Sequence, residues 1–435
     1  MSNKTAYIAM STDLYHSGHV NIINQAAKYG SVIVGILTDE AIATYKRPPI
    51  LNAEERKQIV ASFKNVDKVV LQETLDYTQN LRALKPDYVV HGDDWRTGIQ
   101  QQIRNKVISV LLEWGGELIE VPYTHGRTLS GDKLSHALSA ALNTPEQRLS
   151  KLKKLLQLKP YIRAIDTSNG LTGLIAEHAR FIDEETMTVK EFDAMWISSL
   201  CDSSFKGKPD IELVEMTSRI QTINEIMEVT TKPIILDGDT GGKVEHFSYH
   251  VKTLERMGVS AVIIEDKTGL KQNSLFGTDA VQVLDEPESF AMKIKAGKQA
   301  QATRDFMIIA RLESLIAGND VDDALMRAKI YVEAGADAVM IHSKEKHGKD
   351  IFEFMKKFRE YSMSIPIVVV PTTYNQFTED KLYAGGANIV IHANHLLRSA
   401  YPAMMKTAES ILATGSSLQA SKEYCMPIKE VLTFI

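Results

Sequence analysis

The sequence predicts an α/β protein of two domains: a doubly wound, Rossmann-like domain over residues 1–145 and a (β/α)8 TIM barrel over residues 146–435. Three observations lead to this prediction. The chain has 435 residues, which exceeds the size at which a single core usually stops growing. Short apolar runs alternate with helix-like stretches in two separate blocks, a pattern typical of parallel sheets covered by helices. A polar, basic stretch at 142–160 separates the blocks and is expected to be a linker running into a helix.

The first block contains five strand candidates separated by helix-like stretches such as 19–29 and 53–63. The candidates are continuous apolar runs at 4–10, 31–37, 67–71, 87–91 and 117–121. Continuous apolar strands are buried on both faces, so this block predicts a small doubly wound domain.

The second block repeats the alternation over a longer stretch. Its strand candidates lie at 161–165, 192–197, 233–237, 260–265, 306–310, 336–342, 366–370 and 388–392. Each is followed by a helix-like stretch, as a (β/α)8 barrel requires.

Composition excludes several classes of function. The net charge is −5, so no basic field predicts binding to nucleic acid or to an anionic membrane. No run approaches the ~20 apolar residues of a membrane span. The start, MSNKTAYIAM, lacks the pattern of a signal peptide, and Cys201 and Cys425 have no metal-like or redox-like spacing. We therefore expect a cytoplasmic protein without a membrane span or a nucleic-acid partner.

Polar residues end five consecutive barrel strands, where ligands of such barrels bind. One polar residue at a strand end is more often a helix cap or a surface ion pair than a functional group. Five strands that present acids, an arginine and a histidine at one end favour a binding site instead. The residues are Ser198, Ser199, Asp237, Asp239, Glu265, Arg311 and His342.

The three acids at this end predict a metal site. Asp237, Asp239 and Glu265 would repel one another unless a cation joined them. Oxygen ligands without sulfur indicate Mg²⁺ or Mn²⁺. Arg311 and His342 could then hold an oxyanionic substrate, because the arginine fork matches carboxylate and phosphate geometry.

The segment KTGLKQNSLFG at 267–277 follows the strand that ends at Glu265. Its glycines and polar residues are typical of a surface loop. Its Lys-x-Asn-Ser pattern favours a lid over the barrel mouth, since these side chains could contact a phosphate when the lid closes.

These motifs together resemble the phosphoenolpyruvate mutases of the isocitrate lyase superfamily. The resemblance runs over nearly all of 150–435 and rests on LDGDTGG, EDKTGLKQNSLF, ARLESLIAG and MIHSKE, in the order of the family. It implies Mg²⁺ dependence, a swapped last helix, a homodimer or homotetramer, and interconversion of phosphoenolpyruvate and 3-phosphonopyruvate in phosphonate biosynthesis.

The resemblance also implies residue roles. Asp237 matches a direct metal ligand, and Asp239 and Glu265 match acids that hold the metal through water. Ser199 stands where the family usually has glycine. The implied catalytic residues are Asp210, Lys271, Asn273, Arg311 and His342. The implied substrate-binding residues are Trp196, Ser198, Ser199, Leu200, Ser274 and Leu275.

Two relatives within the superfamily provide alternatives. Its C–C lyases carry a cysteine in the loop that here reads KTGLKQNS, so lyase activity is not expected. Phosphonopyruvate hydrolases are closer, and Asn273 in the loop favours the mutase. Cys201 is expected to be a small buried hydrophobic residue.

A second motif, His16-x-Gly-His19, follows the first strand of the N-terminal block. Two histidines at a helix N-terminus lie where the helix dipole and free N–H groups favour phosphate, and Gly18 allows close approach of the backbone. So short a motif also occurs by chance or as ordinary capping.

Further motifs follow in order: Lys46 in a polar loop, Arg56 in AEERKQIV, HGDDW at 91–95 and GRTLS at 126–130. Together with His16-x-Gly-His19 they resemble, over about 4–140, the glycerol-3-phosphate cytidylyltransferase family of H-x-G-H nucleotidyltransferases. The resemblance implies CTP as a co-substrate, with His16 and His19 stabilising its phosphates. The implied nucleotide-binding residues are Gly18, Lys46, Arg56, Asp94, Trp95, Arg127 and Ser130. The family's Gly-Thr-Phe-Asp start reads MSTD here, and its Ile-Ser-Thr-Thr reads LSGD.

Two functions therefore stay open. The first is a bifunctional enzyme in which the N-terminal domain transfers CMP to a phosphonate or phosphate acceptor. The second is a phosphonopyruvate hydrolase with a nucleotide-sensing N-terminal domain that does not turn CTP over.

Overall fold

The computed structural model describes residues 4–11, 15–45, 48–96, 100–122, 143–183, 188–269 and 271–433. The chain divides into two compact units. The first comprises Met1–Thr144, Lys153–Pro160 and Ala179–Glu191, and the second comprises Pro145–Leu152, Tyr161–His178 and Phe192–Ile435. This grouping is not a single cut between residues 145 and 146, and the predicted domain boundaries stay a prediction.

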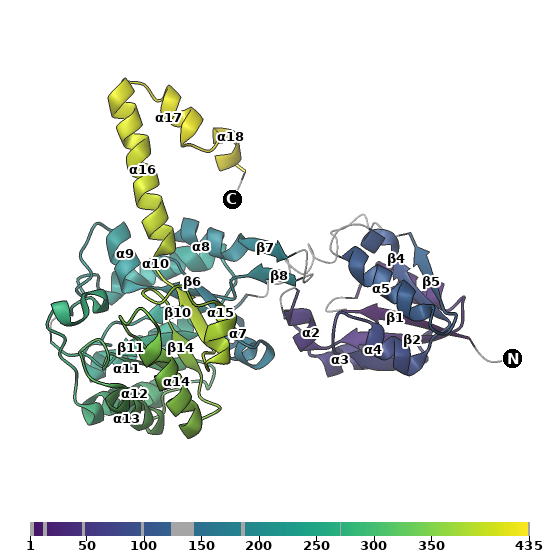
Figure 1. Ribbon diagram of the computed structural model, residues 1–435, viewed down its shortest axis with the longest axis horizontal. Coiled ribbons are helices and arrows are strands. Elements are labelled where there is room, and N and C mark those ends of the chain that lie inside the picture. Colours follow the sequence, from purple (N-terminus) through teal and green to yellow (C-terminus); the bar gives the residue numbers. More distant parts are fainter. Residues whose placement is uncertain are drawn as a thin grey trace. The chain divides into compact units, whose positions relative to one another are not determined.

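The first unit contains a parallel five-stranded sheet in the order β3-β2-β1-β4-β5. Figure 1 labels its strands β1, β2, β4 and β5. Its strands are β1 (Thr5–Met10), β2 (Ser31–Leu37), β3 (Lys68–Gln72), β4 (Tyr88–Gly92) and β5 (Glu117–Val121). All five predicted strands are confirmed. The strand order reverses between β1 and β4, and crevices that bind ligands lie at such switch points.

Helices cover both faces of this sheet, so the doubly wound prediction is confirmed. Alternate residues of β1 point to opposite faces. On one face Ala6 and Ile8 pack with Ile23 of α1 (Ser17–Ala26) and Val60 of α3 (Ala53–Ala61). On the other face Tyr7 packs in a cluster with residues of α4 (Thr78–Leu84) and α5 (Gln101–Leu111). Two shorter helices are α2 (Asp39–Ala43) and the 3₁₀ helix η1 (Asp93–Arg96).

The second unit contains a closed barrel of eight parallel strands in the order β10-β11-β12-β13-β14-β15-β6-β9. The strands are β6 (Ile162–Asp166), β9 (Ala194–Ile197), β10 (Ile234–Asp237), β11 (Ala261–Glu265), β12 (Met307–Leu312), β13 (Ala338–Ile341), β14 (Ile367–Val369) and β15 (Ile389–His392). Each lies within a predicted run or overlaps it closely, so the predicted barrel is confirmed.

The side chains of the barrel strands alternate between two environments. One set packs against the surrounding helices and includes Ile197, Leu236, Ile264, Ala310 and Ile341. Because the side-chain period of a strand is two, the other set faces the barrel interior. The interior set runs through Trp196, Ile235, Ile263, Ile309 and Met340. The next interior positions along these strands are Ser198, Asp237, Glu265, Arg311 and His342, so the alternation directs these residues into the barrel mouth.

Helices surround the barrel. They are α7 (Pro145–Leu158), α8 (Gly170–His178), α9 (Ser199–Phe205), α10 (Met216–Val229), α11 (Val244–Met257), α12 (Pro287–Ala300), α13 (Val321–Glu333), α14 (Lys349–Tyr361) and α15 (Glu379–Ala384), with the 3₁₀ helix η3 (Ser274–Asp279). The predicted helix after the linker is α7.

The sequence patterns did not predict an antiparallel hairpin of β7 (Arg180–Asp183) and β8 (Thr188–Glu191). Its strands are four residues each and mix charged with apolar side chains, so they lack a continuous apolar run.

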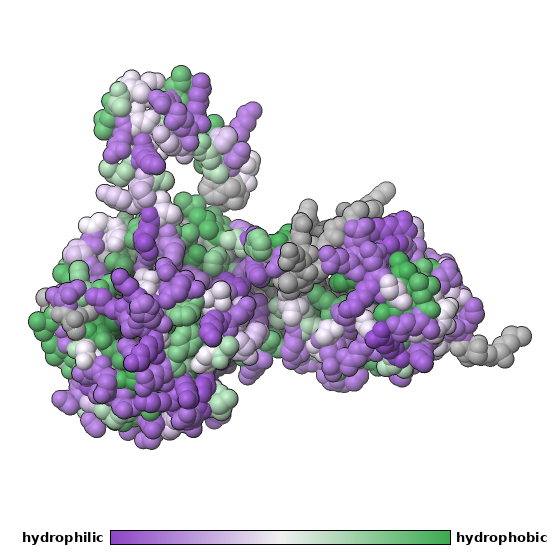
Figure 2. Space-filling view, viewed as in Figure 1, coloured by the Kyte–Doolittle hydropathy of each residue, from purple (hydrophilic) through white to green (hydrophobic). Residues whose placement is uncertain are grey.

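The chain after the barrel forms an exposed arm of α16 (His395–Thr414), α17 (Leu418–Glu423) and α18 (Ile428–Val431). In Figure 1 α16 points away from the barrel, and no residue of α16 is buried. Large apolar side chains of the arm are exposed among polar ones (Figure 2), including Tyr401, Met404, Leu412 and Ile428. Within the described ranges, no helix combines the length and apolar character needed to cross a membrane.

Candidate functional site

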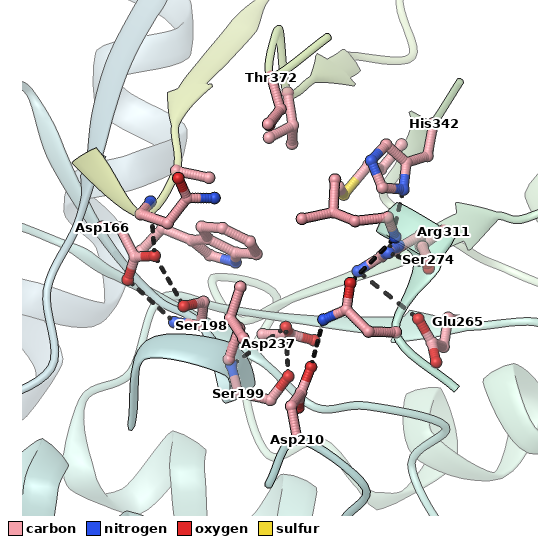
Figure 3. Close-up of a pocket in the computed structure, with 18 of the residues that line it drawn as sticks. Asp166, Ser198, Ser199, Asp210, Asp237, Glu265, Ser274, Arg311, His342 and Thr372 are labelled. Carbon is pink, nitrogen blue, oxygen red and sulfur yellow. Dashed lines mark hydrogen bonds and ion pairs between the residues drawn. The ribbon is translucent and has the colours of Figure 1, made fainter. Parts of the chain in front are cut away.

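The mouth of the barrel holds a pocket lined by the ends of its strands (Figure 3). Asp166 ends β6, Asp237 ends β10 and Glu265 ends β11. Arg311 lies near the end of β12, and His342 directly follows β13. The pocket therefore brings together side chains that lie up to 228 positions apart in the chain, from Asp166 to Asn394.

The acidic side of the pocket is built on the turn after β10. A Cβ atom on Gly238 would lie 2.7 Å from Val262 Cγ2 and 2.9 Å from the carbonyl oxygen of Ile263, so only glycine fits this close approach. Asp239 has a positive φ of 54°, a strained conformation for a residue with a side chain. Its amide donates to Asp237 Oδ1 at 3.2 Å, which fixes the two carboxylates relative to each other.

Arg219 of α10 supports Asp239 from behind the pocket. Its Nη1 donates to Asp239 Oδ2 at 3.0 Å, and its Nη2 donates to the carbonyl oxygen of Ile197 at 3.3 Å. Its Nε lies 3.7 Å from Asp202 Oδ2. The sequence motifs gave no sign of Arg219, because it lies inside α10 and does not directly follow a strand in the sequence.

The predicted lid, residues 267–277, lies over the pocket with its polar side chains bonded to the barrel; position 270 is outside the described residues. Lys271 Nζ donates to Ser199 Oγ at 2.7 Å, to Asp210 Oδ1 at 2.8 Å and to Asp239 Oδ1. Asn273 Nδ2 donates to Asp210 Oδ2 at 2.6 Å. The lid is thus closed, and Asp210 is joined to it by two residues.

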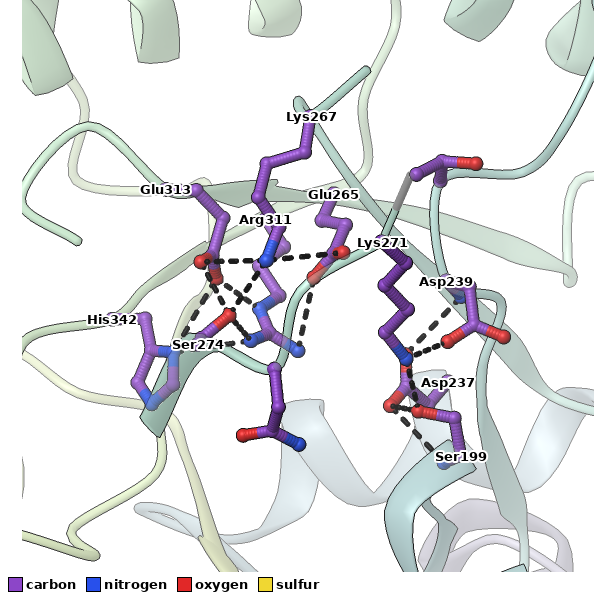
Figure 4. A network of polar contacts seen from close by, with 12 residues as sticks. Ser199, Asp237, Asp239, Glu265, Lys267, Lys271, Ser274, Arg311, Glu313 and His342 are labelled. Carbon is purple, nitrogen blue, oxygen red and sulfur yellow. Dashed lines mark hydrogen bonds and ion pairs between the residues drawn. The ribbon is translucent and has the colours of Figure 1, made fainter. Parts of the chain in front are cut away.

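The opposite side of the pocket is a network in which Arg311 and Lys267 pair with two acids, Glu313 and Glu265 (Figure 4). Arg311 Nε donates to Glu313 Oε1 at 2.5 Å, and Arg311 Nη2 donates to Ser274 Oγ at 2.8 Å. Ser274 Oγ donates to Glu313 Oε2 at 2.5 Å. Lys267 Nζ donates to Ser274 Oγ at 2.9 Å. This network orients Arg311 before any ligand binds.

His342 is buried, and burial lowers its pKa below the usual range, so the ring is neutral near pH 7. Arg311 Nη2 lies 3.1 Å from His342 Nδ1, and Glu313 Oε1 lies 3.3 Å from the same atom. A neutral ring that accepts from Arg311 at Nδ1 carries its proton on Nε2. Nε2–H is then free to donate to an anionic ligand.

Asp237 and Asp239, the two aspartates predicted to hold the metal, differ in pKa. Burial would raise the pKa of Asp237, but the charges of Lys271 and Arg311 outweigh it and lower the pKa. Burial raises the pKa of Asp239 despite Lys271 and Arg219. Burial also raises the pKa of Glu265, to about 7. Asp237 is therefore the acid best suited to stay ionised and hold a cation directly.

The acids also fit a hydrated Mg²⁺ ion. Across the described part of the chain, no three His, Cys, Asp or Glu side chains gather closely enough to enclose a metal by themselves. Mg²⁺ often uses one or two carboxylates and keeps several waters, which suits one direct ligand and two acids that act through water. Glu265 Oε1 is buried without a hydrogen bond, although Lys267 Nζ lies 3.3 Å away, so this oxygen could still accept from a metal-bound water.

A buried group at the pocket edge was missed from sequence. Asp166 Oδ2 accepts from Ser198 Oγ at 2.7 Å, from Cys201 Sγ at 2.9 Å and from the amide of Asn394 at 3.0 Å. Burial raises the pKa of Asp166 to about 6 and raises the pKa of the Cys201 thiol. Cys201 is buried, as expected, but it also donates to a carboxylate. Asp166 could have been predicted from the sequence, because it ends the first barrel strand.

The other predicted residues of the barrel also line the pocket: Trp196, Leu200 and Leu275. Several further lining residues had no role predicted from the sequence: Asp166, Met340, Val370, Thr372, Ala393 and Asn394. Asp166 ends β6 and Met340 lies in β13, whereas the other four follow β14 and β15 and carry neither an acid nor a base.

The first unit places its histidine motif at the switch point of the sheet. His16 is the N-cap of α1, which follows β1, and its Nδ1 accepts from the amide of Gly18 at 3.1 Å. His19 Nδ1 accepts from the amide of His16 at 3.4 Å, and the two ring centroids are 4.0 Å apart. The two imidazoles therefore form a pair at a helix N-terminus, next to the strand reversal.

The predicted nucleotide-binding residues Asp94 and Trp95 lie in η1, directly after β4, the neighbour of β1. Trp95 is buried, stacks on His91 with centroids 3.7 Å apart and donates from Nε1 to Glu120 Oε1 at 3.0 Å. Arg56 is fully buried and donates to Asp39 and to the carbonyl oxygen of Ser11. These contacts give Trp95 and Arg56 structural partners, and their nucleotide roles stay predictions.

The remaining nucleotide predictions cannot be placed on this site. Lys46, Arg127 and Ser130 lie outside the described residues, and Asp94 is described only by its backbone in η1.

Comparison with known proteins identifies both units. The family model described as phosphoenolpyruvate phosphomutase matches residues 152–412, more than half of the chain. A family model described as cytidylyltransferase-like matches residues 11–122.

Individual relatives resemble the barrel. The phosphoenolpyruvate phosphomutase of Tetrahymena pyriformis is 34% identical over 286 residues, covering 66% of this chain and 90% of that protein. The phosphonopyruvate hydrolase of Variovorax sp. (strain Pal2) is 38% identical over 254 residues, covering 58% of this chain and 82% of that protein.

Solved structures agree. The crystal structure of phosphoenolpyruvate phosphomutase from Streptomyces platensis subsp. rosaceus matches with a TM-score of 0.59 and 34% identity, covering 66% of this chain and 94% of that one. A phosphonopyruvate hydrolase in complex with oxalate and Mg²⁺ matches with a TM-score of 0.57 and 31% identity, covering 67% and 94%. Through its barrel the chain belongs to the phosphoenolpyruvate phosphomutase family, and its N-terminal unit is a cytidylyltransferase-like domain.

Proposed function

We propose that the barrel is a phosphoenolpyruvate phosphomutase that interconverts phosphoenolpyruvate and 3-phosphonopyruvate. The observation that carries the proposal is the lid, because it joins the two sides of one pocket. Lys271 and Asn273 contact the acidic side through Asp210, and Ser274 contacts the cationic side through Arg311. A substrate enclosed there would have one end at the carboxylates and the other at Arg311 and His342.

The roles follow from the chemistry of the transfer. A phosphoryl group that moves from the enol oxygen to C3 of the same molecule passes through a loose, metaphosphate-like transition state. Such a group needs charge stabilisation and exclusion of water more than a strong nucleophile. Its oxygens are held by Arg311, His342 Nε2–H and Asn273 while the enolate turns, and Ser274 keeps Arg311 in place. Trp196, Ser198, Ser199, Leu200 and Leu275 enclose the pyruvate part.

The proposed metal is Mg²⁺, with Mn²⁺ as the second choice. Asp237 would bind it directly, and Asp239 and Glu265 would bind its waters. When bound there, the ion would supply positive charge beside the enolate oxygen.

Phosphonopyruvate hydrolase is the alternative, since relatives of similar identity include both enzymes. The two differ in whether water reaches the phosphoryl group. Two lid contacts to Asp210 and one to Arg311 support the mutase, because a closed lid excludes water.

Phosphorus NMR of phosphonopyruvate with Mg²⁺ tests the proposal. The intact chain should form phosphoenolpyruvate without free phosphate, and Asp237→Ala should abolish the conversion. Stoichiometric inorganic phosphate would instead identify a hydrolase, and an unchanged spectrum would reject both activities.

For the N-terminal unit we propose transfer of CMP from CTP to a phosphonate or phosphate acceptor. The histidine pair at the switch point of a cytidylyltransferase-like domain supports it. Release of pyrophosphate from CTP in the presence of an alkylphosphonate tests it, whereas binding of CTP without pyrophosphate would favour the sensing module.

We further propose domain limits at 1–145 and 146–435, a cytoplasmic location, and a homodimer or homotetramer formed through the barrel. The exposed apolar side chains of α16 to α18 support assembly, because patches of this kind usually mark interaction surfaces. Sedimentation equilibrium of the intact chain tests the assembly, and a monomer would contradict it.

A further inference from the structure

The Ser199 hydroxyl lies between the lid and the acidic side of the pocket. Ser199 is the first residue of α9 and is 6% exposed. Its Oγ donates to Asp237 Oδ2 at 3.1 Å and accepts from Lys271 Nζ at 2.7 Å. The Ser199 hydroxyl therefore donates its proton to the carboxylate of Asp237 and accepts a hydrogen bond from the ammonium of Lys271 in the lid (Figure 4).

The ammonium of Lys271 is buried and fully satisfied. Its three N–H groups have three acceptors, which are Ser199, Asp210 and Asp239. Burial alone would lower the pKa of Lys271, but the surrounding carboxylates outweigh it and raise the pKa, so the side chain stays charged. Loss of any acceptor would leave a buried, charged donor without a partner, which is costly.

The three acceptors are not equivalent. Asp239 Oδ2 is engaged by Arg219, and Asp210 Oδ2 is engaged by Asn273 of the lid itself. Ser199 is the neutral acceptor of the three, and it is the one whose side chain bonds both Lys271 and Asp237. Its backbone amide also donates to Asp237 Oδ2 at 3.2 Å, so the main chain would keep Asp237 in place without the hydroxyl.

We propose that the Ser199 hydroxyl is a positioning group that latches the closed lid by joining Lys271 to Asp237. The latch rests on these contacts alone. Its consequence for catalysis rests on the proposed phosphomutase function, in which the closed lid keeps water away from the phosphoryl group. Ser199 thus acts on the reaction through Lys271.

Hydrogen exchange of the full chain without ligand tests the latch. In Ser199→Ala, peptides that cover 271–276 should exchange about tenfold faster than in the wild type. Ser199→Thr keeps a hydroxyl and should stay within about twofold of the wild type. Ser204→Ala, on the same helix and outside the pocket, should also stay within about twofold.

Two results would overturn the latch. One is exchange in Ser199→Ala within about twofold of the wild type. The other is equal acceleration in Ser199→Thr, because then packing at this position would hold the lid in place of the hydroxyl. Tryptic cleavage of the Lys271–Gln272 bond, followed by mass spectrometry, should be faster in Ser199→Ala than in Ser199→Thr and the wild type.

A phosphorus assay then connects the latch to the proposed reaction. With phosphonopyruvate and Mg²⁺, Ser199→Ala should release a larger fraction of inorganic phosphate than the wild type, and Ser199→Thr should not. If the wild type lacks mutase activity, the proposed function fails, yet the exchange data still decide whether the latch exists.

Discussion

The barrel mouth and the switch point of the N-terminal sheet follow the same rule, since both place the candidate site residues after the carboxyl ends of parallel strands. They differ in whether the sheet closes on itself into a barrel or stays open. The closed barrel gathers the ends of all its strands on one rim, so Asp166, Asp237 and His342 line one pocket. The open sheet spreads its strand ends along an edge, and only β1 and β4 flank the reversal. A strand-end pattern is therefore more informative in a barrel than in an open sheet.

The two sites also differ in how their polar side chains are held before a ligand binds. At the barrel mouth Arg311, Lys271 and Arg219 are held by buried acids before a ligand arrives. In the described part of the N-terminal site, the histidine pair lies at the end of a helix and its rings contact each other. The barrel site is therefore preorganised for an anion.

The largest expected effect comes from Arg311. Arg311→Lys keeps the charge but loses the fork that reaches Glu313 and Ser274 together. We expect phosphonopyruvate turnover to fall about 10²–10³-fold, the usual range for loss of one transition-state donor. Pyrophosphate release from CTP should not change. A parallel loss of both activities would show that the two sites are coupled.

Substitution of His16 should affect the N-terminal unit and leave the barrel reaction unchanged. His16→Ala should lower pyrophosphate release about 10²-fold if the imidazole stabilises the phosphates of CTP, with phosphonopyruvate turnover unchanged. His16→Asn is the matched control, because asparagine is a good N-cap and keeps α1 intact. Equal activity of His16→Asn and the wild type would show that His16 serves only as a cap.

A smaller effect concerns the pH dependence of barrel stability. Burial raises the folded pKa of Asp166 to about 6, above the ~3.9 of an unfolded aspartate. The folded state then binds more protons between these values, so this contribution to stability is present at low pH and is lost as pH rises from about 4 to 6. Relative to the wild type, Asp166→Asn should gain about 1 kcal/mol between pH 5 and pH 7.

Urea unfolding of the barrel at the two pH values measures this gain. Asp322→Asn, at a surface carboxylate, is the control and should show no such change. A loss of stability in Asp166→Asn at pH 7 would mean that the bonds from Ser198 and Cys201 require the charged acid.

The smallest expected effect concerns the stability of the N-terminal unit. It depends on pH in the opposite direction to the contribution of Asp166. The hydrogen bond from Arg104 lowers the pKa of Glu120 to about 2, so its contribution is present above about pH 4.5 and is lost as pH falls toward 2. Glu120→Gln should cost no more than about 1 kcal/mol at pH 7 and less near pH 3, because the pair is partly exposed. Thermal unfolding checks the slope, with the exposed Glu117→Gln as control. A cost that does not change with pH would assign the effect to the contact with Trp95.

Most of the fold could be predicted from the sequence, because buried parallel strands are continuous apolar runs. The hairpin of β7 and β8 could not, since its short strands mix Arg180 and Lys190 with apolar residues. The acids and cations at strand ends also could be predicted. Arg219 and Thr372 could not, because only the folded chain brings a helix interior and a loop residue to the same mouth.

The start of α7 has a practical consequence for expressing the barrel apart from the N-terminal unit. Arg148 donates to the carbonyl oxygens of Met227 and Lys232, and its own carbonyl oxygen accepts from Ser260 Oγ at 2.7 Å. Gly258, at a φ of 90°, leaves no room for a side chain beside Pro145. A shortened gene that begins at residue 152, where the family match begins, would lack this anchor. An independently expressed barrel should therefore begin before Pro145, at the cost of carrying a few residues of the preceding segment.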